Sequence, residues 1–289
     1  MFTAQPQELP RGLLPLFLLL GTEEKSGFLI VIFLYDPFFN NCATIIREIA
    51  ENVLKNKIIF QSNYLKDGQS FRQLMNIEIP WNTWGSFGIN LALGRKLDQV
   101  ATAKQYMYLP DYVYSGFKNA KIIRNGNYKG LIKTDRYILK FNELKIEPSF
   151  LNPFLVFTLL LLIGVFITYK DVKRKKRTKW FDFLLFFSTG IIGLLIVFLW
   201  FFTNHSTTPI NFNFLWAFAP NIIIAFYLLK ENPKLWVKTY LKILIILLLS
   251  IAFIWIGKIQ LLPFAILPII LLLLIRFFYL SKKLLSFKE

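Results

Sequence analysis

Long apolar segments in the second half of the chain constrain its fold more than any other feature. A helix needs about 20 apolar residues to cross the hydrocarbon core of a bilayer. Stretches such as LVFTLLLLIGVFITY and ILIILLLSIAFIWIG have no polar face, which argues against a large soluble helical core. Five segments have or approach the required length: Phe150–Tyr169, Phe181–Thr203, Phe214–Leu229, Tyr240–Gly257 and Leu261–Leu280. The sequence therefore predicts an all-α bundle of five transmembrane helices in residues 149–289.

Two of the predicted membrane helices contain prolines. Pro220 interrupts the third segment, which is also short, and Pro263 and Pro268 lie in the fifth. Membrane helices tolerate proline where neighbouring groups satisfy the freed carbonyls. Lys242 and Arg276 lie close enough to helix ends for their charges to reach the interface, so no predicted helix carries a charge near its middle. A transporter with a charged coupling site therefore lacks support.

The charges of the loops predict how the chain crosses the membrane. Loops 170–179 and 230–238 carry seven and three Lys or Arg residues, and the C-terminal tail carries three. The opposite loops, 204–213 and 258–260, carry none and one. Because basic residues collect on the cytoplasmic side, the tail and the two basic loops are expected there. Five crossings of the inner (cytoplasmic) membrane then place residues 1–148 in the periplasm.

The formal net charge of +17 is compatible with a nucleic-acid partner. Much of that charge lies in the loops that set the topology, however, so no nucleic acid is expected. Membrane phospholipids are the expected partners, because the basic run 170–179 meets their headgroups. One cysteine, one histidine and the lack of a GxxxxGK[ST] stretch give no support to a metalloenzyme or nucleotide enzyme, so no cofactor or metal is expected.

The divergent amino end, residues 1–34, contains two apolar runs. RGLLPLFLLLG, at 11–21, resembles a poor secretory signal, with a proline inside it and no A-x-A cleavage site. FLIVIFL, at 28–34, is too short to span a membrane and predicts a buried strand. Export of the following residues would depend on this weak signal or on the first membrane helix, unless the chain has lost its original amino end.

The single cysteine, Cys42, lies where a helix is predicted to begin. The apolar residues from Ile45 to Leu54 have one-sided helical spacing, and Asn40 and Asn41 can cap the first turn. The positive end of the helix dipole would stabilise a thiolate there, and backbone N–H groups could hold an oxyanion. A buried structural cysteine is the commoner alternative, and both interpretations remain open.

Residues 70–122 are rich in aromatic side chains that could line a groove, although an ordinary core is the commoner outcome. The aromatic residues concerned are Trp81, Trp84, Phe87, Tyr106, Tyr108, Tyr112 and Tyr114. The stretch that follows, KIIRNGNYKGLIK at 121–133, predicts a β-hairpin with its turn around Asn125–Gly126.

Several short motifs occur in order from Tyr35 to Pro220 and together resemble the Lnb-type family, whose members carry a periplasmic domain followed by membrane helices. The motifs are YDPFFNNCATIIRE, SFRQL, WGSFGINLALGRKLDQVAT, YMYLPDY and FNFLWAFAP. The resemblance implies an α+β domain at residues 35–148, of a partial, circularly permuted papain or NlpC/P60-like type. The membrane domain at 149–289 would follow it.

The resemblance also implies a set of functional residues. Cys42 matches the family's NCAT cysteine and would be the acyl-accepting nucleophile of a lipoprotein N-acyltransferase. Asn41, Thr44 and Arg47 match its neighbours and would position or support it. Asp98 matches an acid whose role the resemblance does not assign.

One part of the family pattern is missing from this chain. Family members carry a GH…R-type motif before the cysteine, and its histidine would be the base, whereas the single histidine here is His205. The simplest interpretation is a member truncated at the amino end, which would lack base activation worth a factor of about 10²–10⁴. His205 lies in an outer loop with Thr207, Asn211 and Asn213. This polar set either holds a lipid headgroup or amine, or is simply exposed.

Three functions remain open from the sequence. The first is a membrane-anchored, cysteine-dependent acyltransferase of the cell envelope, which would N-acylate lipoproteins through an acyl-Cys42 intermediate. The second is a cysteine hydrolase or peptidase of the envelope, with water as the acceptor. The third is a catalytically inactive, truncated membrane protein or binding module, which the missing upstream histidine favours.

Overall fold

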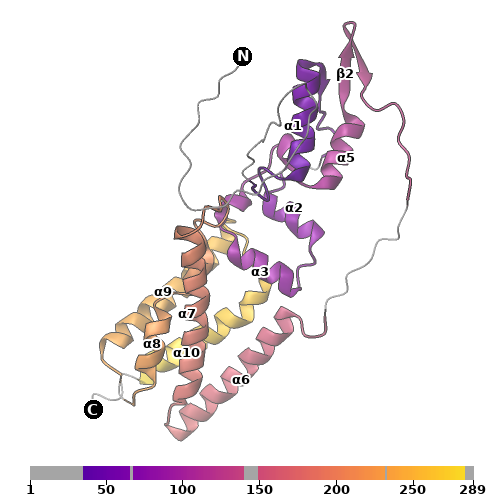
Figure 1. Cartoon of the computed structure of the whole chain (residues 1–289). Helices are drawn as coiled ribbons and strands as arrows, with labels where there is room; N and C mark the ends of the chain where they lie inside the picture. Colours follow the sequence, from indigo (N-terminus) through magenta and orange to yellow (C-terminus); the bar gives the residue numbers. More distant parts are fainter. Residues whose placement is uncertain (1–34, 66–67, 140–148, 232, 284–289) are drawn as a thin grey trace, which may run out of the picture. The chain divides into compact units, whose positions relative to one another are not determined.

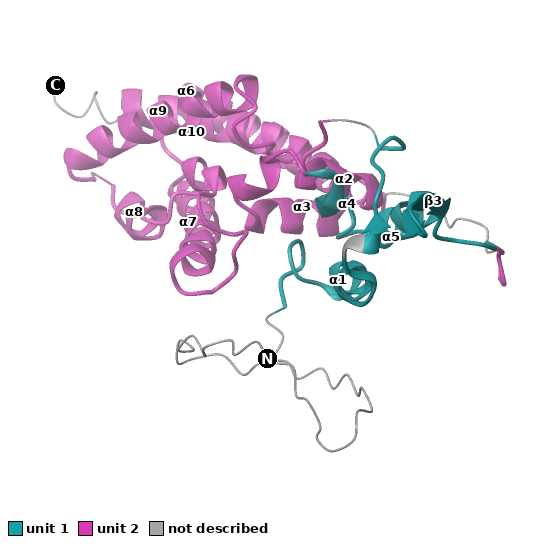
Figure 2. Ribbon diagram, turned by 90° about the horizontal axis from the view of Figure 1, so that it is seen from above, with its two compact units in different colours: residues 1–65, 102–135 teal, residues 66–101, 136–289 magenta. Residues whose placement is uncertain are grey.

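The structure is a computed structural model that divides into two compact units (Figure 2). It describes residues 35–65, 68–139, 149–231 and 233–283. Unit 1 comprises the chain up to residue 65 together with 102–135, and unit 2 comprises 66–101 together with the chain from 136 onward. The segment 68–101 thus shares a unit with the membrane helices, although it precedes them in sequence. The strand predicted at 28–34 lies outside the described residues.

Unit 1 is a small α+β arrangement. Helix α1 (Cys42–Leu54) leads through the 3₁₀ helix η1 (Lys55–Lys57) into strand β1 (Ile58–Ile59), and the unit continues with α4 (Ala103–Tyr106), α5 (Pro110–Asn119), β2 (Lys121–Arg124) and β3 (Asn127–Gly130). The strands form an antiparallel sheet of order β1-β2-β3, in which Ile58 lies opposite Ile122. An α+β region is therefore present, whereas a permuted papain-like arrangement is not confirmed by these elements.

The predicted hairpin is confirmed. Strands β2 and β3 are joined by Asn125 and Gly126, which have φ angles of 52° and 77°. Asn and Gly adopt this left-handed conformation with the least strain, and two such residues in succession form the type I′ turn that suits a twisted hairpin. The core of the unit is small and lies between α1 and α5, where Ala43, Met107 and Val113 are buried together.

In unit 2, the segment ahead of the membrane helices folds into α2 (Phe71–Glu78), α3 (Trp84–Ala92) and the 3₁₀ helix η2 (Arg95–Asp98). Ser70 and Thr83 start the two α-helices, because each hydroxyl oxygen accepts a hydrogen bond from a first-turn amide. Phe87 and Leu91 of α3 belong to the same buried core as the membrane helices. This segment is therefore packed into the membrane unit.

The aromatic residues predicted in this segment pack mostly on other rings. Trp84 and Phe87 both contact Phe157, with ring centroids 5.7 and 5.1 Å apart. In unit 1, Tyr106 and Tyr108 are buried. Ordinary packing, the commoner of the two outcomes expected from the sequence, accounts for Phe87, Tyr106 and Tyr108. Trp81 and Tyr114 are exposed and each lines a cavity.

Four helices in the described part of the chain are long and apolar enough to cross a membrane. They are α6 (Pro153–Arg174), α7 (Lys179–Phe201), α9 (Trp236–Ile256) and α10 (Leu267–Lys283), the last preceded by the 3₁₀ helix η4 (Phe264–Ile266). Helix α10 packs against both α6 and α9 (Figure 1). Four of the predicted segments thus form membrane-length helices, and these make the chain a multi-pass membrane protein.

The third predicted segment, Phe214–Leu229, is not a continuous helix. It forms the end of the 3₁₀ helix η3 (Phe212–Leu215) and the short helix α8 (Asn221–Leu228), with Pro220 as the N-cap residue of α8. Proline has no N–H for the helical hydrogen bond, and its ring collides with the preceding turn. Five continuous helices are therefore not confirmed, and one broken segment takes the place of the third.

This broken segment runs along α7 in the reverse direction. Near the end of α7, Thr208 Oγ1 donates to Leu199 O at 2.7 Å. Just ahead of α7, Arg177 donates to Lys230 O at 2.6 Å. The stretch 208–230 therefore returns over nearly the whole length of α7 without a long helix of its own.

Two glycines of α7 make this close return possible. A Cβ added at Gly190 would collide with the backbone of Ile222, and one added at Gly193 would collide with the backbone of Ala217. Irregular backbone at membrane depth is tolerated where protein buries it, and Ala217 is fully buried.

The Arg276 side chain does not extend to the membrane interface, so the prediction from its position near a helix end is wrong. Its side chain is fully buried, and its guanidinium is paired with Asp182 of α7 and with Asp171 of α6, the latter at 2.7 Å. Thr168 Oγ1 accepts a further hydrogen bond from it, and Arg177 also pairs with Asp182. Two arginines and two aspartates balance one another in this cluster. Such pairing is how charged side chains are accommodated among membrane helices, and here it joins α6, α7 and α10.

Candidate functional site

Cys42 is the first residue of α1, and its side chain is exposed. The helix begins there because Asn41 Oδ1 accepts hydrogen bonds from the backbone N–H groups of Ala43 and Thr44, at 2.9 and 3.0 Å. Thr44 Oγ1 accepts in turn from Asn41 N at 2.9 Å, which completes a capping box. The prediction that this cysteine opens a capped helix is confirmed, and the alternative of a buried cysteine is wrong.

The same cap limits the oxyanion site that the start of α1 can offer. Asn41 Oδ1 occupies the amides of Ala43 and Thr44, and Ile45 N donates to Asn41 O. Within the described part of the chain, the backbone N–H of Cys42 is the one amide of this turn that has no partner. An oxyanion formed at Cys42 would therefore have one amide donor from this turn.

The residues expected to support Cys42 hold the helix in place. Asn41 Nδ2 donates to Tyr108 O at 2.9 Å, which ties the start of α1 to the turn before α5. Arg47 donates to Lys104 O at 2.9 Å and pairs with Glu48, so it braces α1 one turn further on. Among the described residues, no hydrogen bond joins Asn41, Thr44 or Arg47 to the thiol. They shape the position of Cys42 through the backbone.

An exposed apolar stripe continues from Cys42 along α1. Ile46, Ile49 and Val53 follow the cysteine at helical spacing and are 53%, 48% and 72% exposed. Ile46 also borders a cavity of about 300 Å³ that α5 lines with Val113, among other residues. The thiol therefore has exposed apolar side chains next to it on the same face of α1.

Asp98 forms a buried ion pair with Arg72 in unit 2. Arg72 Nε lies 3.0 Å from Asp98 Oδ1, and the two side chains are 0% and 5% exposed. Leu261 N donates to the same carboxylate oxygen at 3.0 Å. Burial raises the pKa of Asp98 above its usual value, and the Arg72 guanidinium and the Leu261 amide limit that rise. Burial likewise lowers the pKa of Arg72, against the opposing effect of Asp98.

Arg72 uses every nitrogen of its guanidinium inside the protein. Besides the pair with Asp98, it donates to Asn90 Oδ1 at 2.9 Å and to the carbonyl oxygens of Leu93 and Gly94 at 3.0 and 2.7 Å. A planar, five-donor group can hold three chain segments at once. Arg72 therefore fixes α2, α3 and η2 relative to one another, and Asp98 is the counter-ion of this buried arginine.

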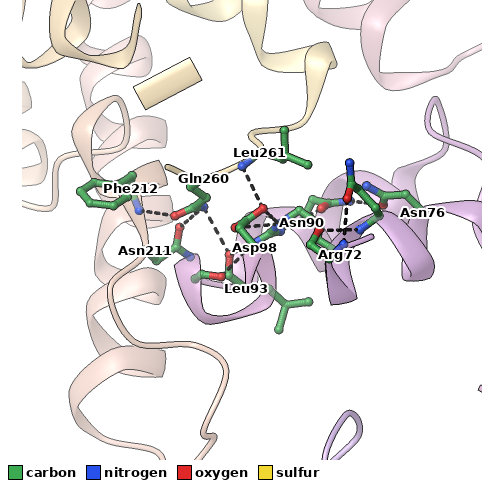
Figure 3. Close-up of polar contacts among 12 residues, drawn as sticks. Arg72, Asn76, Asn90, Leu93, Asp98, Asn211, Phe212, Gln260 and Leu261 are labelled. Atoms are coloured by element: carbon green, nitrogen blue, oxygen red, sulfur yellow. Dashed lines mark hydrogen bonds and ion pairs between the residues drawn. The ribbon is translucent and has the colours of Figure 1, made fainter. Parts of the chain in front are cut away.

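A network of buried amides connects this arrangement to the broken membrane segment (Figure 3). Asn211 Nδ2 donates to Leu91 O at 2.8 Å, and Asn213 Nδ2 donates to Asn90 O at 3.1 Å. Gln260 Nε2 donates to Asn211 Oδ1 at 3.2 Å. Asn211 and Asn213 are therefore structural residues that join η3 to α3.

His205 is not part of this network. Its side chain is exposed, whereas Asn211 and Asn213 are 2% and 0% exposed. The polar residues of this loop were expected to act together, but His205 is exposed whereas Asn211 and Asn213 are buried. The candidate residues also divide between the units: Cys42 with its neighbours lies in unit 1, and Asp98 lies in unit 2 with His205.

Sequence reasoning did not identify Arg72, Asn90 or Gln260 as partners of Asp98 and Asn211. One signal was available, since Arg72 lies between Phe71 and Leu74 at the start of an otherwise apolar helix face. A buried arginine on such a face requires an acidic partner. Across the residues that the structure describes, no group of three His, Cys, Asp or Glu side chains could hold a metal ion.

Residues 145–286 match the family model described as the Lnb transmembrane domain. The matched region includes all four long helices and the broken segment. No curated protein and no solved structure matches the chain.

Proposed function

Because this chain belongs to the Lnb-type family through the membrane domain at residues 145–286, we propose that it is a membrane-anchored, cysteine-dependent acyltransferase of the cell envelope. The observation that carries the proposal is an exposed thiol on the first residue of a capped helix. The backbone N–H of Cys42, which the cap of α1 leaves without a partner among the described residues, is positioned to donate to an oxyanion formed at the sulfur. The apolar stripe beyond it supports a lipid substrate.

The reaction has two steps in this proposal. The sulfur of Cys42 attacks an ester carbonyl of a membrane phospholipid, a thioester forms, and the ester C–O bond breaks. The lysophospholipid leaves as an alcohol that carries the thiol proton. The α-amine of a lipid-modified N-terminal cysteine of a lipoprotein then attacks the thioester, forms an amide and returns a proton to the sulfur.

The membrane domain supports this choice of substrates. Donor and acceptor are both held in the bilayer, so an enzyme anchored by several helices meets both at the membrane surface. In the proposal, Cys42 lies on the periplasmic side of the inner membrane, and the basic loop 170–179 and the C terminus lie on the cytoplasmic side. The asymmetry of Lys and Arg between the loops is the support for this orientation.

The test uses the full chain in phospholipid vesicles, with a donor labelled in its acyl chain and a diacylglyceryl-cysteine peptide as the acceptor. Label should appear in an amide of the peptide with the wild-type chain and not with Cys42→Ala. Asn52→Ala, a change at an exposed residue of α1 that lies outside the apolar stripe, should leave the transfer intact. Transfer that persists in Cys42→Ala would show that the nucleophile is wrong.

The same assay separates the two alternative functions. Release of labelled fatty acid without an amide product would assign a hydrolase, in which water resolves the thioester. The absence of both products, from a chain that is folded and membrane-inserted, would assign the inactive protein that the missing upstream histidine favours.

A further inference from the structure

A cavity of about 510 Å³ lies between the C-terminal ends of α6 and α10, which pack side by side (Figure 1). It is lined by Thr168, Asp171, Val172 and Lys175 from the α6 side and by Phe278, Tyr279, Lys282 and Lys283 from α10. The proposed acyl transfer does not use this cavity, because none of the residues proposed for that reaction lines it: the lining belongs to unit 2 and Cys42 to unit 1.

The charge around the cavity is positive. Lys175, Lys282 and Lys283 line it, and Lys175 and Lys282 form no ion pair within the described residues. The one acid of the lining, Asp171, already accepts from Arg276 at 2.7 Å and from Thr178 Oγ1 at 2.6 Å. The acid is thus neutralised by its own neighbours, while the ammonium groups of Lys175 and Lys282 can attract an anion. Lys283 adds its positive charge to the lining while its Nζ donates to Lys175 O at 2.8 Å.

A hydroxyl group of the lining has no acceptor. Tyr279 Oη is buried, and no hydrogen-bond partner for it exists among the described residues. The ring of Tyr279 lies against the Arg276 guanidinium, with 4.7 Å between the guanidinium carbon and the ring centroid, so the ring is held in place. A buried donor without an acceptor is destabilising, and a ligand oxygen would relieve that cost.

The rim of the cavity is apolar and open to the lipid side. Val172 is 59% and Phe278 46% exposed, and both belong to helices of membrane-spanning length. Both helices end within a few residues of the cavity, at Arg174 and Lys283, which sets its depth near a membrane interface. A lipid headgroup there would meet the ammonium groups while its acyl chains follow the exposed apolar side chains.

We propose that this cavity binds the phosphodiester headgroup of an anionic phospholipid from the leaflet that adjoins the basic loop 170–179. The lysines neutralise the phosphate and Tyr279 Oη donates to one of its oxygens. Basic pockets between membrane helices commonly hold such headgroups. The bound lipid would close the gap between α6 and α10 beside the buried cluster of Arg276, and so stabilise the helix bundle.

The experiment titrates the purified full chain with phosphatidylglycerol and with phosphatidylcholine of identical acyl chains, and counts bound lipids by native mass spectrometry. The first phosphatidylglycerol should bind at least about tenfold more tightly than phosphatidylcholine, because the zwitterionic phosphocholine headgroup carries no net negative charge to attract the lysines. Equal binding of the two lipids would overturn the proposal.

The matched variants carry equal charge changes in the same region. Replacing Lys175, Lys282 and Lys283 together by Gln should weaken the first phosphatidylglycerol by roughly tenfold or more. Replacing Lys170 and Lys173 at the end of α6 and Lys176 just after it by Gln removes as many charges from the same region but none from the cavity lining, and should preserve the tight site. An equal loss in both sets would mean general attraction to the basic loop and would overturn the proposal.

Two further measurements test the proposed contact and the identity of the ligand. The first is a conservative substitution that should not disturb folding, and the second is competition with inorganic phosphate. Tyr279→Phe removes one oxygen and should weaken phosphatidylglycerol binding by at least about fivefold, since a hydrogen bond to a charged acceptor is lost. Unchanged binding in this variant would contradict the proposed contact. Inorganic phosphate should not displace the lipid at millimolar concentration, and displacement would assign the cavity to a free anion.

Discussion

Arg72 and Asp98 form an ion pair in which Nε lies 3.0 Å from Oδ1 and neither side chain is more than 5% exposed. The pair joins the start of α2 to the end of η2, and Leu261 N donates to the same carboxylate. The Asp98 carboxylate thereby connects Arg72 and the segment ahead of the membrane helices to Leu261 of the membrane domain. The family resemblance identified Asp98 but gave it no role, and the structure assigns it this structural contact.

Removal of the arginine from this pair should destabilise the membrane unit. Arg72→Met leaves the Asp98 carboxylate buried without its counter-ion, for which we expect a loss of about 3–5 kcal/mol. Arg95→Met is the matched control, because Arg95 is an exposed arginine of η2 and should change stability by less than about 0.5 kcal/mol. Thermal unfolding of both variants in detergent measures the difference. Equal unfolding temperatures of the two variants would mean that the Arg72–Asp98 pair does not stabilise the segment 68–101.

The close return of the chain along α7 should not tolerate a side chain at Gly193. A Cβ there meets the backbone of Ala217 and Ala219, which cannot rotate away as a side chain could. Gly193→Leu should therefore cost at least about 1–3 kcal/mol, seen as a lower unfolding temperature or as aggregation. Gly88→Leu on α3, where a Cβ meets nothing within 4 Å, should be tolerated. Similar behaviour of the two variants would show that α7 and residues 217–219 are not in contact.

The cap at the start of α1 should be measurable in the exchange of single amides. Asn41→Ala removes the acceptor for Ala43 N and Thr44 N, which should cost about 0.5–2 kcal/mol and speed hydrogen exchange at these two amides. Asn41→Asp keeps the accepting oxygen but loses the donation to Tyr108 O, so it should protect the two amides while loosening the contact with the turn before α5. Exchange that is unchanged in Asn41→Ala would contradict the capping role.

Asp135 in unit 1 should titrate below its ordinary range. Hydrogen bonds from Tyr114 Oη, at 2.6 Å, and from Lys118 hold the pKa of Asp135 below its usual 3.8. A lowered pKa in the folded state means that this stabilisation is complete above about pH 3.8 and is lost as the pH falls through the lower value. Tyr114→Phe should move the pKa of Asp135 upward, measured by carboxyl-carbon NMR, and Tyr128→Phe should not. A pKa that stays unchanged in Tyr114→Phe would show that the hydroxyl does not act on this carboxyl.

Local chemistry explains which parts of the fold could be predicted. Asn41 before Cys42 and the pair Asn125–Gly126 are features that determine structure within a few residues, and both predictions hold. Four of the apolar segments also form long helices, because length and hydropathy depend only on the local sequence. The third segment is nearly as long and apolar as the others. It is broken because Pro220 interrupts the helix and because Gly190 and Gly193 of α7 let its irregular backbone pack closely.

The buried polar contacts could not be predicted from the sequence, because each joins residues that are far apart along the chain. Asn211 donates to Leu91, and Arg276 pairs with Asp182 across the bundle. Proximity to a helix end suggested that Arg276 would extend to the interface, but two aspartates on neighbouring helices offered a buried alternative. Single-sequence patterns carry no record of which helices become neighbours. The same reason explains why Asn211 and Asn213 were expected to face a ligand or solvent although they are buried against α3.

The most direct test of the central claim is intact-protein mass spectrometry of the full chain isolated from phospholipid membranes. We predict an added mass of one fatty acyl group that neutral hydroxylamine removes and that Cys42→Ala lacks. A thioester has this lability, whereas an amide or a tightly bound lipid does not. A chain without the added mass, or a Cys42→Ala chain that still carries it, would contradict the assignment of Cys42 as the acyl-accepting nucleophile.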